Sequence, residues 1–265
     1  MCTAFVHKGK DRICGFNFDV PDGAMKDVKL FMDGDSFWIG FPFTPDLAAL
    51  PEGMKEIPAG YLPYIGGYLR IEGVHRNGSF GSQLNVLSYP KAPFAAEPDT
   101  VPLYALVDRF LSAGTGLDGL LDAARTKRIV NMPSAAAEIP DAAMHSLLSD
   151  RSGRVVILEP GNGYAEICDR FAVMSNFPML ILPGDLREDR YGYYGADRYE
   201  TAVNMLADAG EEFSPADALK VLDAVKQTGY APTRVSFVYT EKENAVYYVT
   251  EHDFAHVRKH CFAEG

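Results

Sequence analysis

The chain has 265 residues, of which 47% are hydrophobic and 23% are charged, as in an ordinary globular protein. Its formal net charge of −11 argues against a nucleic-acid groove and against docking on anionic lipid, because both need clustered positive charge. The sequence contains no run of the roughly 20 apolar residues that cross a bilayer, and no secretory signal. We therefore expect a cytoplasmic protein without nucleic-acid or membrane partners.

The first third of the chain reads as β-strands. Runs of alternating apolar and polar residues, rich in aromatics and bounded by Gly and Pro, are typical of strands. The Asn77-Gly78 step predicts a tight hairpin, because this pair suits the positive φ angles of such a turn. The expected strands are 2–7, 12–20, 36–43, 68–74 and 84–89.

The rest of the chain alternates between helical and strand patterns. Apolar residues at 3-4 spacing predict helices, and Thr100, Asp197 and Ser214 are candidate caps. The expected helices are 100–110, 117–129, 140–148, 198–209 and 216–226, and the expected strands are 154–158, 165–175, 234–240 and 245–250. This order predicts one domain in which sheets stack between pairs of helices.

The four cysteines are too few to form a disulfide scaffold in a chain of this length. They are Cys2, Cys14, Cys168 and Cys261. Buried free thiols are the expected state, with a Cys14–Cys168 bridge as the open alternative. Cys2 differs from the others because it directly follows Met1.

Removal of Met1 would make Cys2 the first residue, because methionine aminopeptidases act before small residues. A free α-amine has a pKa of about 7.7–8.0, so part of it is an unprotonated base at neutral pH. The base and the thiol nucleophile would then belong to a single residue, without a separate histidine. The alternative is a chance cysteine that is inert and partly buried.

Asn17 and Asp19 lie two residues apart in the second expected strand, so their side chains point to the same side. If this strand pairs with the one that starts at Cys2, Asp19 reaches the new α-amine and orients it. An ordinary strand end before the turn at 21–23 explains Asp19 equally well.

Short motifs follow one another along the chain. They are Met1-Cys2-Thr3, Gly15-Phe16-Asn17-Phe18-Asp19, Val173-Met174-Ser175-Asn176-Phe177-Pro178, Asp197-Arg198-Tyr199 and a closing hairpin at 235–250. In this order they resemble the linear amide C–N hydrolases, which include choloylglycine hydrolases, penicillin V acylases and related N-acyl amidases. The resemblance spans nearly the whole chain. It implies an α+β fold, a four-layer αββα sandwich with antiparallel sheets of the N-terminal-nucleophile hydrolase type, as a single domain of residues 1–265 with Met1 removed.

The resemblance implies a role for each matching residue. Cys2 would be the nucleophile, its α-amine would be the general base and later the acid, and Asp19 would hydrogen-bond that amine. The Asn176 side chain would donate to the oxyanion of the tetrahedral intermediate. Arg198 would lie near Cys2 and favour the thiolate. Asn17 matches a family asparagine in the same strand and is a candidate for binding substrate or oxyanion.

Two positions depart from the family pattern. Phe16 stands where bile-salt hydrolases have an arginine beside the nucleophile, which leaves Arg198 or Arg12 as the nearby cation. His75 stands, within the segment 73–79, at the position of an asparagine that helps to build the family's oxyanion hole. We keep Phe16 and His75 as candidate substrate-binding or oxyanion-binding residues, and Phe16 favours an apolar acyl group.

The predicted activity is hydrolysis of a linear amide bond in a small N-acyl substrate through an acyl-thioester intermediate. No cofactor or metal is expected, and the oligomeric state stays open, with a homo-oligomer allowed. Early aromatic residues would line an acyl pocket or belong to the core: Phe37, Trp38, Phe41, Phe43, Tyr61, Tyr64 and Tyr68.

Three alternatives to a hydrolase remain. A catalytically altered or silent binding protein can use the same scaffold, and so can an acyltransferase. The third is a zinc-binding protein, because His252, His256 and His260 are spaced by four and would share one face of a helix.

Overall fold

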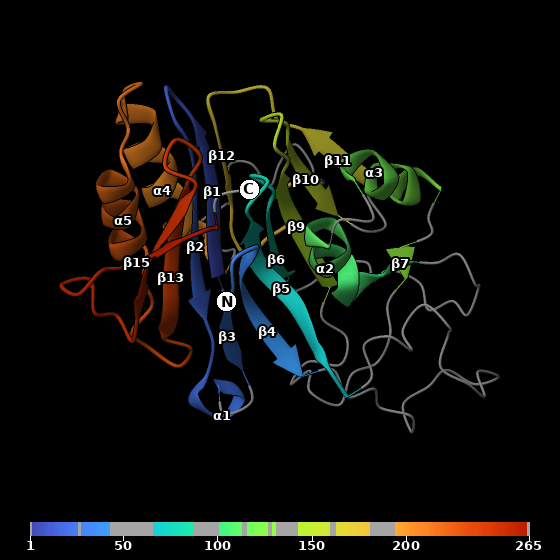
Figure 1. Ribbon diagram of the computed structural model, residues 1–265, viewed down its shortest axis with the longest axis horizontal. Coiled ribbons are helices and arrows are strands. Elements are labelled where there is room, and N and C mark those ends of the chain that lie inside the picture. The colour runs from blue at the N-terminus through green and yellow to red at the C-terminus, as the bar shows by residue number, and fades with distance from the viewer. Residues whose placement is uncertain are drawn as a thin grey trace.

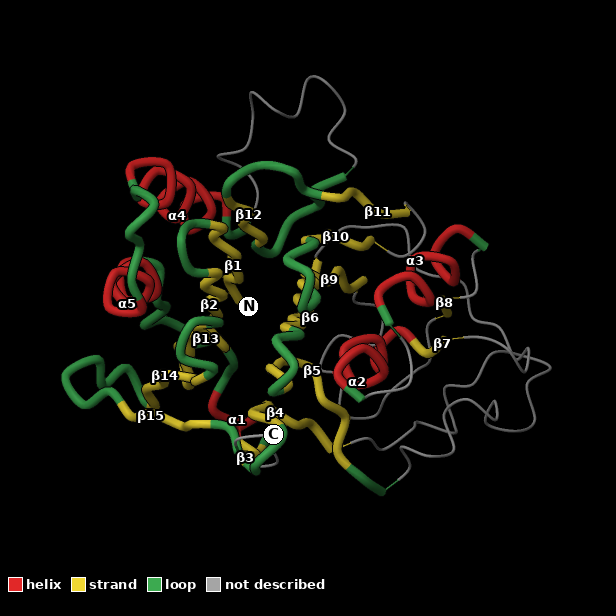
Figure 2. The backbone as a smooth tube through the Cα atoms, turned by 45° about the horizontal axis from the view of Figure 1, so that its top comes forward, coloured by secondary structure: helices red, strands yellow, loops and turns green. Residues whose placement is uncertain are grey.

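The computed structural model describes residues 2–25, 28–42, 66–86, 101–112, 116–126, 129–130, 143–159, 163–180 and 194–263. Two antiparallel sheets lie face to face at the centre, and each carries helices on its outer side (Figures 1 and 2). The view of Figure 2, which looks nearly along the strands, shows the four layers in the order helix, sheet, sheet, helix.

The first sheet brings the two ends of the chain together. Its strands, in spatial order, are β12 (Phe171–Met174), β1 (Cys2–Lys8), β2 (Arg12–Asp19), β13 (Thr233–Thr240), β14 (Ala245–Thr250) and β15 (Arg258–Cys261). Cys2 pairs with Phe18, and β12 flanks β1 on its other side. The N-terminal strand therefore has neighbours on both sides, which fixes the position of Cys2.

The second sheet is formed by the middle of the chain. Its order is β11 (Gly163–Glu166), β10 (Val155–Glu159), β9 (Ala143–Ser149), β6 (Phe80–Val86), β5 (Tyr68–His75), β4 (Ser36–Pro42) and β3 (Lys29–Met32). The predicted turn at Asn77-Gly78 joins β5 and β6, and Gly78 has the positive φ of 92° that such a turn requires.

Helices cover the outer face of each sheet. Against the first sheet lie α4 (Ala196–Asp208) and α5 (Pro215–Ala224). Against the second lie α2 (Leu106–Leu111) and α3 (Leu117–Arg125), together with the 3-10 helix η3 (Leu103–Ala105). The smaller elements are α1 (Asp22–Met25) and a parallel pair of β7 (Val101–Pro102) and β8 (Ile129–Val130).

The alternation of side chains assigns the two faces of each central strand. In β2, Phe16 and Phe18 point to the second sheet and belong to the same buried cluster as Cys2. Ile13 points the other way and packs with α4 and α5, as does Phe5 of β1. The odd-numbered residues of these strands therefore hold the helices, while the even-numbered ones fill the space between the sheets.

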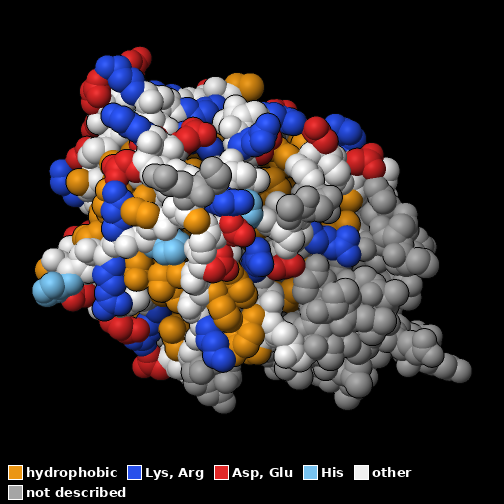
Figure 3. Space-filling model, in the orientation of Figure 1, with side chains coloured by type: hydrophobic (Ala, Val, Ile, Leu, Met, Phe, Trp, Pro, Cys, Tyr) orange, Lys and Arg blue, Asp and Glu red, His pale blue; other side chains and the backbone are white. Residues whose placement is uncertain are grey.

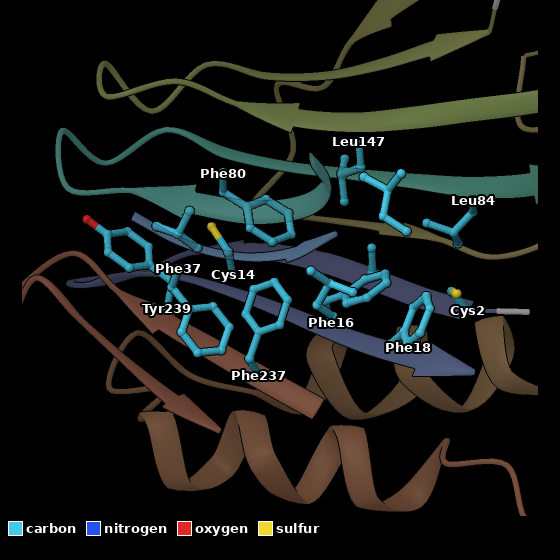
Figure 4. Close-up of a cluster of buried hydrophobic side chains, with 14 of the residues drawn as sticks. Cys2, Cys14, Phe16, Phe18, Phe37, Phe80, Leu84, Leu147, Phe237 and Tyr239 are labelled. Carbon is cyan, nitrogen blue, oxygen red and sulfur yellow. The ribbon is translucent and has the colours of Figure 1, made fainter. Parts of the chain in front are cut away.

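Phe237 of β13 lies at the centre of the packing between the sheets (Figure 4). Its ring centroid is 5.5 Å from that of Phe16, 5.2 Å from that of Phe37 and 6.1 Å from that of Phe80. Phe37 and Phe80 belong to the second sheet, so these contacts join the two layers.

Several expectations from the sequence are wrong. The predicted helix 100–110 begins instead as β7 and η3, so that its α-helical part is α2 alone, and its predicted cap Thr100 lies outside the described residues. The predicted helix 140–148 is instead β9, a strand that pairs with β6 and β10 on its two sides. The predicted strand 165–175 is two strands, β11 and β12, which belong to different sheets. Asp197 does not cap α4, because Gly195 is the residue before its first turn.

The C-terminal histidines do not share a helical face. His252 and His256 lie in turns, and His260 lies in β15. Within the described part of the chain no three side chains of the metal-binding types gather into a metal site. All four cysteines are free, with Cys2 and Cys14 buried and Cys168 and Cys261 exposed, so the expectation of buried thiols holds for the first two. None of the helices in the described ranges is long and apolar enough to span a membrane.

Candidate active site

Cys2 lies at the end of β1, on the face that looks toward the second sheet. Its side chain is 6% exposed and points into the apolar cluster between the sheets (Figure 4). The sulfur lies 4.0 Å from the backbone carbonyl of Asp19, at the end of the neighbouring strand. The register of β1 on β2 therefore brings the end of β2, with Asp19, beside Cys2, whereas the backbone nitrogen of Cys2 donates to Asn176 Oδ1.

Arg198 reaches Cys2 from the first turn of α4. Its Nη1 donates to the Cys2 carbonyl at 2.7 Å and to the Thr3 hydroxyl at 2.9 Å. The same nitrogen lies 3.4 Å from Asp19 Oδ2, and Nη2 donates to Asn176 Oδ1 at 2.8 Å. The guanidinium is buried, so this one cation links the Cys2 backbone to Asp19 and to Asn176.

Asn176, which follows β12, completes the cluster. Its Oδ1 accepts a hydrogen bond from the backbone nitrogen of Cys2 at 2.8 Å, in addition to the one from Arg198. Its Nδ2 donates to the carbonyl of Asn85 at 2.8 Å. Cys2, Asp19, Asn176 and Arg198 are thus joined by hydrogen bonds although they come from four separate segments.

Burial governs the protonation of the Asp19 carboxyl. It raises the pKa of Asp19 to about 7, while Arg198, the hydrogen bond from the Thr233 hydroxyl at 2.6 Å and the positive N-terminus all oppose this rise. Asp19 therefore changes charge near neutral pH.

The Cys2 thiol is not a thiolate at neutral pH. In the chain that still carries Met1, burial raises its pKa to about 11, the positive amine of residue 1 lowers it, and Asp19 and Glu72 raise it further. Arg198 holds the Cys2 carbonyl rather than the sulfur. Attack by this thiol therefore needs a base close to the sulfur at the moment of reaction.

A glycine lets α4 approach the site closely. Gly195, just before α4, has φ of 86°, a backbone conformation that residues with a Cβ rarely adopt. A Cβ there would lie 2.4 Å from Ser175 Oγ and 2.7 Å from Arg198 Nη2. The absence of a side chain at Gly195 therefore allows the guanidinium to pass between the helix start and Asn176.

A buried carboxylate, hydrogen-bonded to a histidine ring, anchors the loop that carries Asn176. Glu159, in β10, accepts hydrogen bonds from the backbone N–H groups of Met179 at 2.5 Å and Leu180 at 3.2 Å. Its partner is His145 of β9, whose Nδ1 lies 3.3 Å from Glu159 Oε1. Burial acts to raise the pKa of Glu159, but these hydrogen bonds outweigh it and lower the pKa. An ionised Glu159 thus holds the loop against the second sheet.

Asn17 and Phe16 lie on opposite faces of β2. The Asn17 side chain faces the helices, where Nδ2 donates to the Leu222 carbonyl and Oδ1 accepts from the Ser236 hydroxyl. Its role as a ligand-binding residue is therefore not supported, because both ends of its amide tie β2 to α5 and β13. Phe16 faces the second sheet, on the same side of β2 as Phe18, the residue that pairs with Cys2.

The structure places His75 and Arg12 far from Cys2. Arg12 pairs with Lys8 at the opposite end of β1 from Cys2, and it donates to the carbonyl of Gly78 in the turn that follows His75. Six residues of extended strand separate the two ends of β1, which corresponds to about 20 Å. His75 therefore cannot build an oxyanion hole at Cys2, and Arg12 cannot act on its thiol.

Asn85 is a site residue that the sequence analysis missed. The β5–β6 ladder ends at the pair of Glu72 and Ser82, and the N–H of Gln83 turns to the Glu72 side chain at 3.0 Å. Two residues further on, the Asn85 carbonyl accepts from Asn176 Nδ2 at 2.8 Å, and the N–H of Asn85 points to the same edge of β6 because both backbone groups of a strand residue share one side. This position depends on strand register, which no local motif reports.

The early aromatic residues divide between core and surface. Phe37 is buried in the core, whereas Trp38 stacks on Phe31 at 3.9 Å and carries Arg70 over its ring. Figure 3 shows hydrophobic side chains at the surface over β4, the strand that holds Trp38. Phe41 lies at 5.7 Å from Phe18, and Tyr68 packs on Phe31. The other predicted pocket residues, Phe43, Tyr61 and Tyr64, lie outside the described residues.

No protein-family model matches the chain, and a search of curated proteins returns no match. Among solved structures, a variant of conjugated bile acid hydrolase from Clostridium perfringens has a TM-score of 0.66 at 13% identity, over 98% of this chain and 92% of that one. Penicillin V acylase from Agrobacterium tumefaciens has a TM-score of 0.58 at 14% identity, over 94% of this chain and 83% of that one. The fold that the sequence resemblance implied is thus confirmed: the chain is an α+β, four-layer αββα sandwich with antiparallel sheets, the fold of these two structures.

Proposed function

We propose that this chain is an amidohydrolase that cleaves the linear amide bond of an N-acyl substrate through Cys2 after Met1 has been removed. One observation carries the proposal: the backbone nitrogen of Cys2 is hydrogen-bonded to Asn176, which Arg198 also holds. In the processed chain that nitrogen is a free amine on the residue that carries the thiol. Base and nucleophile then lie in one fixed unit.

The thiol passes its proton to the α-amine as the sulfur attacks the amide carbonyl. A C–S bond forms, the carbonyl becomes a tetrahedral oxyanion, and the protonated amine then gives its proton to the leaving nitrogen as the C–N bond breaks. Water, deprotonated by the same amine, then attacks the thioester carbonyl: a C–O bond forms, the C–S bond breaks, the acid leaves, and the amine returns the proton to the Cys2 sulfur. The raised pKa of the Cys2 thiol favours this concerted transfer over a pre-formed thiolate.

Two donors suit the oxyanion. The Asn176 amide nitrogen carries two N–H groups, and the Asn85 carbonyl takes one of them. The second donor is the backbone N–H of Asn85, which points beyond the end of the β5–β6 ladder. Loss of one such donor typically costs about 10²–10³-fold in rate.

Asp19 and Arg198 position the reactive residue. The Arg198 guanidinium fixes the Cys2 carbonyl and the Asn176 side chain, and the Asp19 carboxylate lies against that guanidinium. An ionised Asp19 stabilises the positive charge that the α-amine gains during attack. Arg198 thus acts through its neighbours rather than on the sulfur.

Intact-protein mass spectrometry with a panel of N-acyl amides tests the proposal. We expect loss of Met1, followed by a mass increase equal to one acyl group on Cys2. Cys2→Ala removes both the adduct and amide hydrolysis. Cys14→Ala is the matched control, because Cys14 is a second buried thiol on the same face of the first sheet, with its pKa raised by burial to about 12.

The outcomes separate the candidate activities. Adduct and free acid that depend on Cys2 but not on Cys14 support the hydrolase. Transfer of the acyl group to an added amine, without free acid, identifies an acyltransferase instead. Hydrolysis that survives in Cys2→Ala contradicts the proposal.

A further inference from the structure

Polar side chains gather on the inner face of the second sheet, within an otherwise apolar layer. Strand register places Glu72, Ser82 and Leu147 side by side in one row, and Leu84 and His145 side by side in the next. Directly opposed residues point to the same face of a sheet. Leu84 and Leu147 belong to the core cluster that contains Cys2, so Glu72, Ser82 and His145 face the first sheet as well.

Each of these three side chains carries an atom without a hydrogen-bond partner. Glu72, Ser82 and His145 are all 0% exposed. Within the described part of the chain no group bonds Glu72 Oε1, Ser82 Oγ or His145 Nε2. Buried polar atoms normally have hydrogen-bond partners within the protein, because an atom that loses its bonds to water and gains none in return destabilises the fold. Three such atoms on one face of one sheet indicate a place that a ligand completes.

The other end of two of these side chains is fixed. Glu72 Oε2 accepts the N–H of Gln83 at 3.0 Å, and His145 Nδ1 contacts Glu159 at 3.3 Å. Because these hydrogen bonds fix the orientation of each side chain, they also fix the positions of the two unpartnered atoms, Glu72 Oε1 and His145 Nε2.

This polar group is close to the reactive sulfur. The strand β1 packs against β6 and β9, which carry Ser82 and His145. In Figure 4 the Leu84 side chain, the neighbour of His145 in its row, lies at the same end of the sandwich as Cys2.

We propose that Glu72, Ser82 and His145 bind a hydroxyl group carried by the acyl part of the substrate, close to the carbonyl that Cys2 attacks. This inference rests on the proposed amidohydrolase function and narrows its substrate class. The acyl chain that Phe16 favours is thus apolar but bears one hydroxyl group near its reactive end.

A hydroxyl group matches the three free atoms because it both donates and accepts. Burial raises the pKa of Glu72 well above its usual range, and its protonated form offers an O–H donor. The Ser82 hydroxyl donates or accepts, and His145 Nε2 accepts in the tautomer whose Nδ1 donates to Glu159. An unsubstituted alkyl chain would leave all three atoms unsatisfied.

The test uses pairs of straight-chain N-acyl amides that differ only in a hydroxyl at carbon 2, 3 or 4 of the acyl group. For each pair kcat/KM is measured, and Cys2 acylation is followed by mass spectrometry. Sites built to hydrogen-bond a hydroxyl discriminate strongly against the analogue that lacks it, so we expect a preference of at least about 100-fold for one hydroxylated member.

Two variants test whether side chains on the inner face of the second sheet cause the preference for the hydroxylated substrate. Glu72→Leu should lower the ratio of kcat/KM values by at least about 10-fold, since it removes one of the bonds to the hydroxyl. Gln83→Leu is the matched control: Gln83 adjoins Ser82, is buried and also has an unpartnered Oε1, but its Nε2 donates to Leu103 on the helix side. Its ratio should equal that of the wild type.

If Glu72→Leu does not fold, Ser82→Ala provides the same measurement. The inference is overturned if kcat/KM is equal within every pair of substrates. It is also overturned if the preference survives both Glu72→Leu and Ser82→Ala. In either case, acylation of Cys2 would still support the hydrolase proposal. If no pair acylates Cys2, the amidohydrolase proposal fails and this inference fails with it.

Discussion

Burial sets the protonation of two acidic groups, the Cys2 thiol at the start of β1 and the Asp19 carboxyl at the end of β2. The Cys2 thiol and the Asp19 carboxyl both have raised pKa values, because each loses water without a full set of compensating charges. Asp19 is the group that titrates near neutral pH. If its ionised form supports the α-amine, activity should depend on its charge.

We expect kcat/KM to rise with pH through a midpoint near the Asp19 pKa of about 7. Arg198 lowers this pKa, so Arg198→Met should move the midpoint to higher pH in addition to slowing the reaction. Arg198→Lys keeps a positive charge and should leave the midpoint closer to that of the wild type. Profiles of kcat/KM against pH for the wild type and the two variants give the three midpoints. A lower midpoint in Arg198→Met would contradict the assignment of the titration to Asp19.

Motifs found some site residues and missed others for a physical reason. Cys2 and Asp19 lie at the ends of neighbouring strands, so a single pairing fixes their proximity, and motif order was enough to add Asn176 and Arg198. The position of Asn85 depends on where one ladder ends. His75 was misplaced because its motif is short and the fold carries it to the opposite end of the sheets.

At the scale of elements, the start of α4 decides whether Arg198 reaches the site. Gly195→Ala should destabilise the chain and lower activity, because its Cβ would collide with Ser175 and Arg198 and its φ is 86°. Gly153→Ala is the control: its φ is 83° but no atom lies within 4 Å of the added Cβ.

Strain alone costs about 1–2 kcal/mol for a residue with a Cβ in the left-handed region, so both variants should lose at least that much unfolding free energy. Only Gly195→Ala should also lose kcat/KM, by about 10²-fold, since small displacements of positioning groups have effects of that size. Urea unfolding and steady-state kinetics of the two variants test this, and equal kinetic losses would argue against a specific role for Gly195.

Local propensity predicted most elements but failed where tertiary pairing dominates. The segment 140–148 contains Ala, Met and Leu, which favour helices, yet it pairs as β9 between two strands. By contrast, Ser214 and Asp217 form the two reciprocal bonds of a capping box, a local signal that survives in the fold at the start of α5.

At the scale of the whole molecule, aromatic packing between the sheets holds the site together. Phe237→Ala should cost about 3–5 kcal/mol of unfolding free energy, because Phe237 is fully buried and contacts rings from both sheets. Tyr230→Ala, at a side chain that is 80% exposed, should change it by less than about 0.5 kcal/mol. Urea unfolding compares them, and similar costs would contradict this account of the core.

The central claim is that the thiol and the α-amine of Cys2 act as one unit. Two forms of the protein test it most directly: one that begins at Cys2, and one in which a single glycine precedes Cys2 and converts its amine into an amide. With the same N-acyl amide, we expect the glycine-extended form to acylate at least about 10²-fold more slowly, since general-base catalysis contributes rate factors of that size. Equal acylation rates for the two forms would contradict the claim.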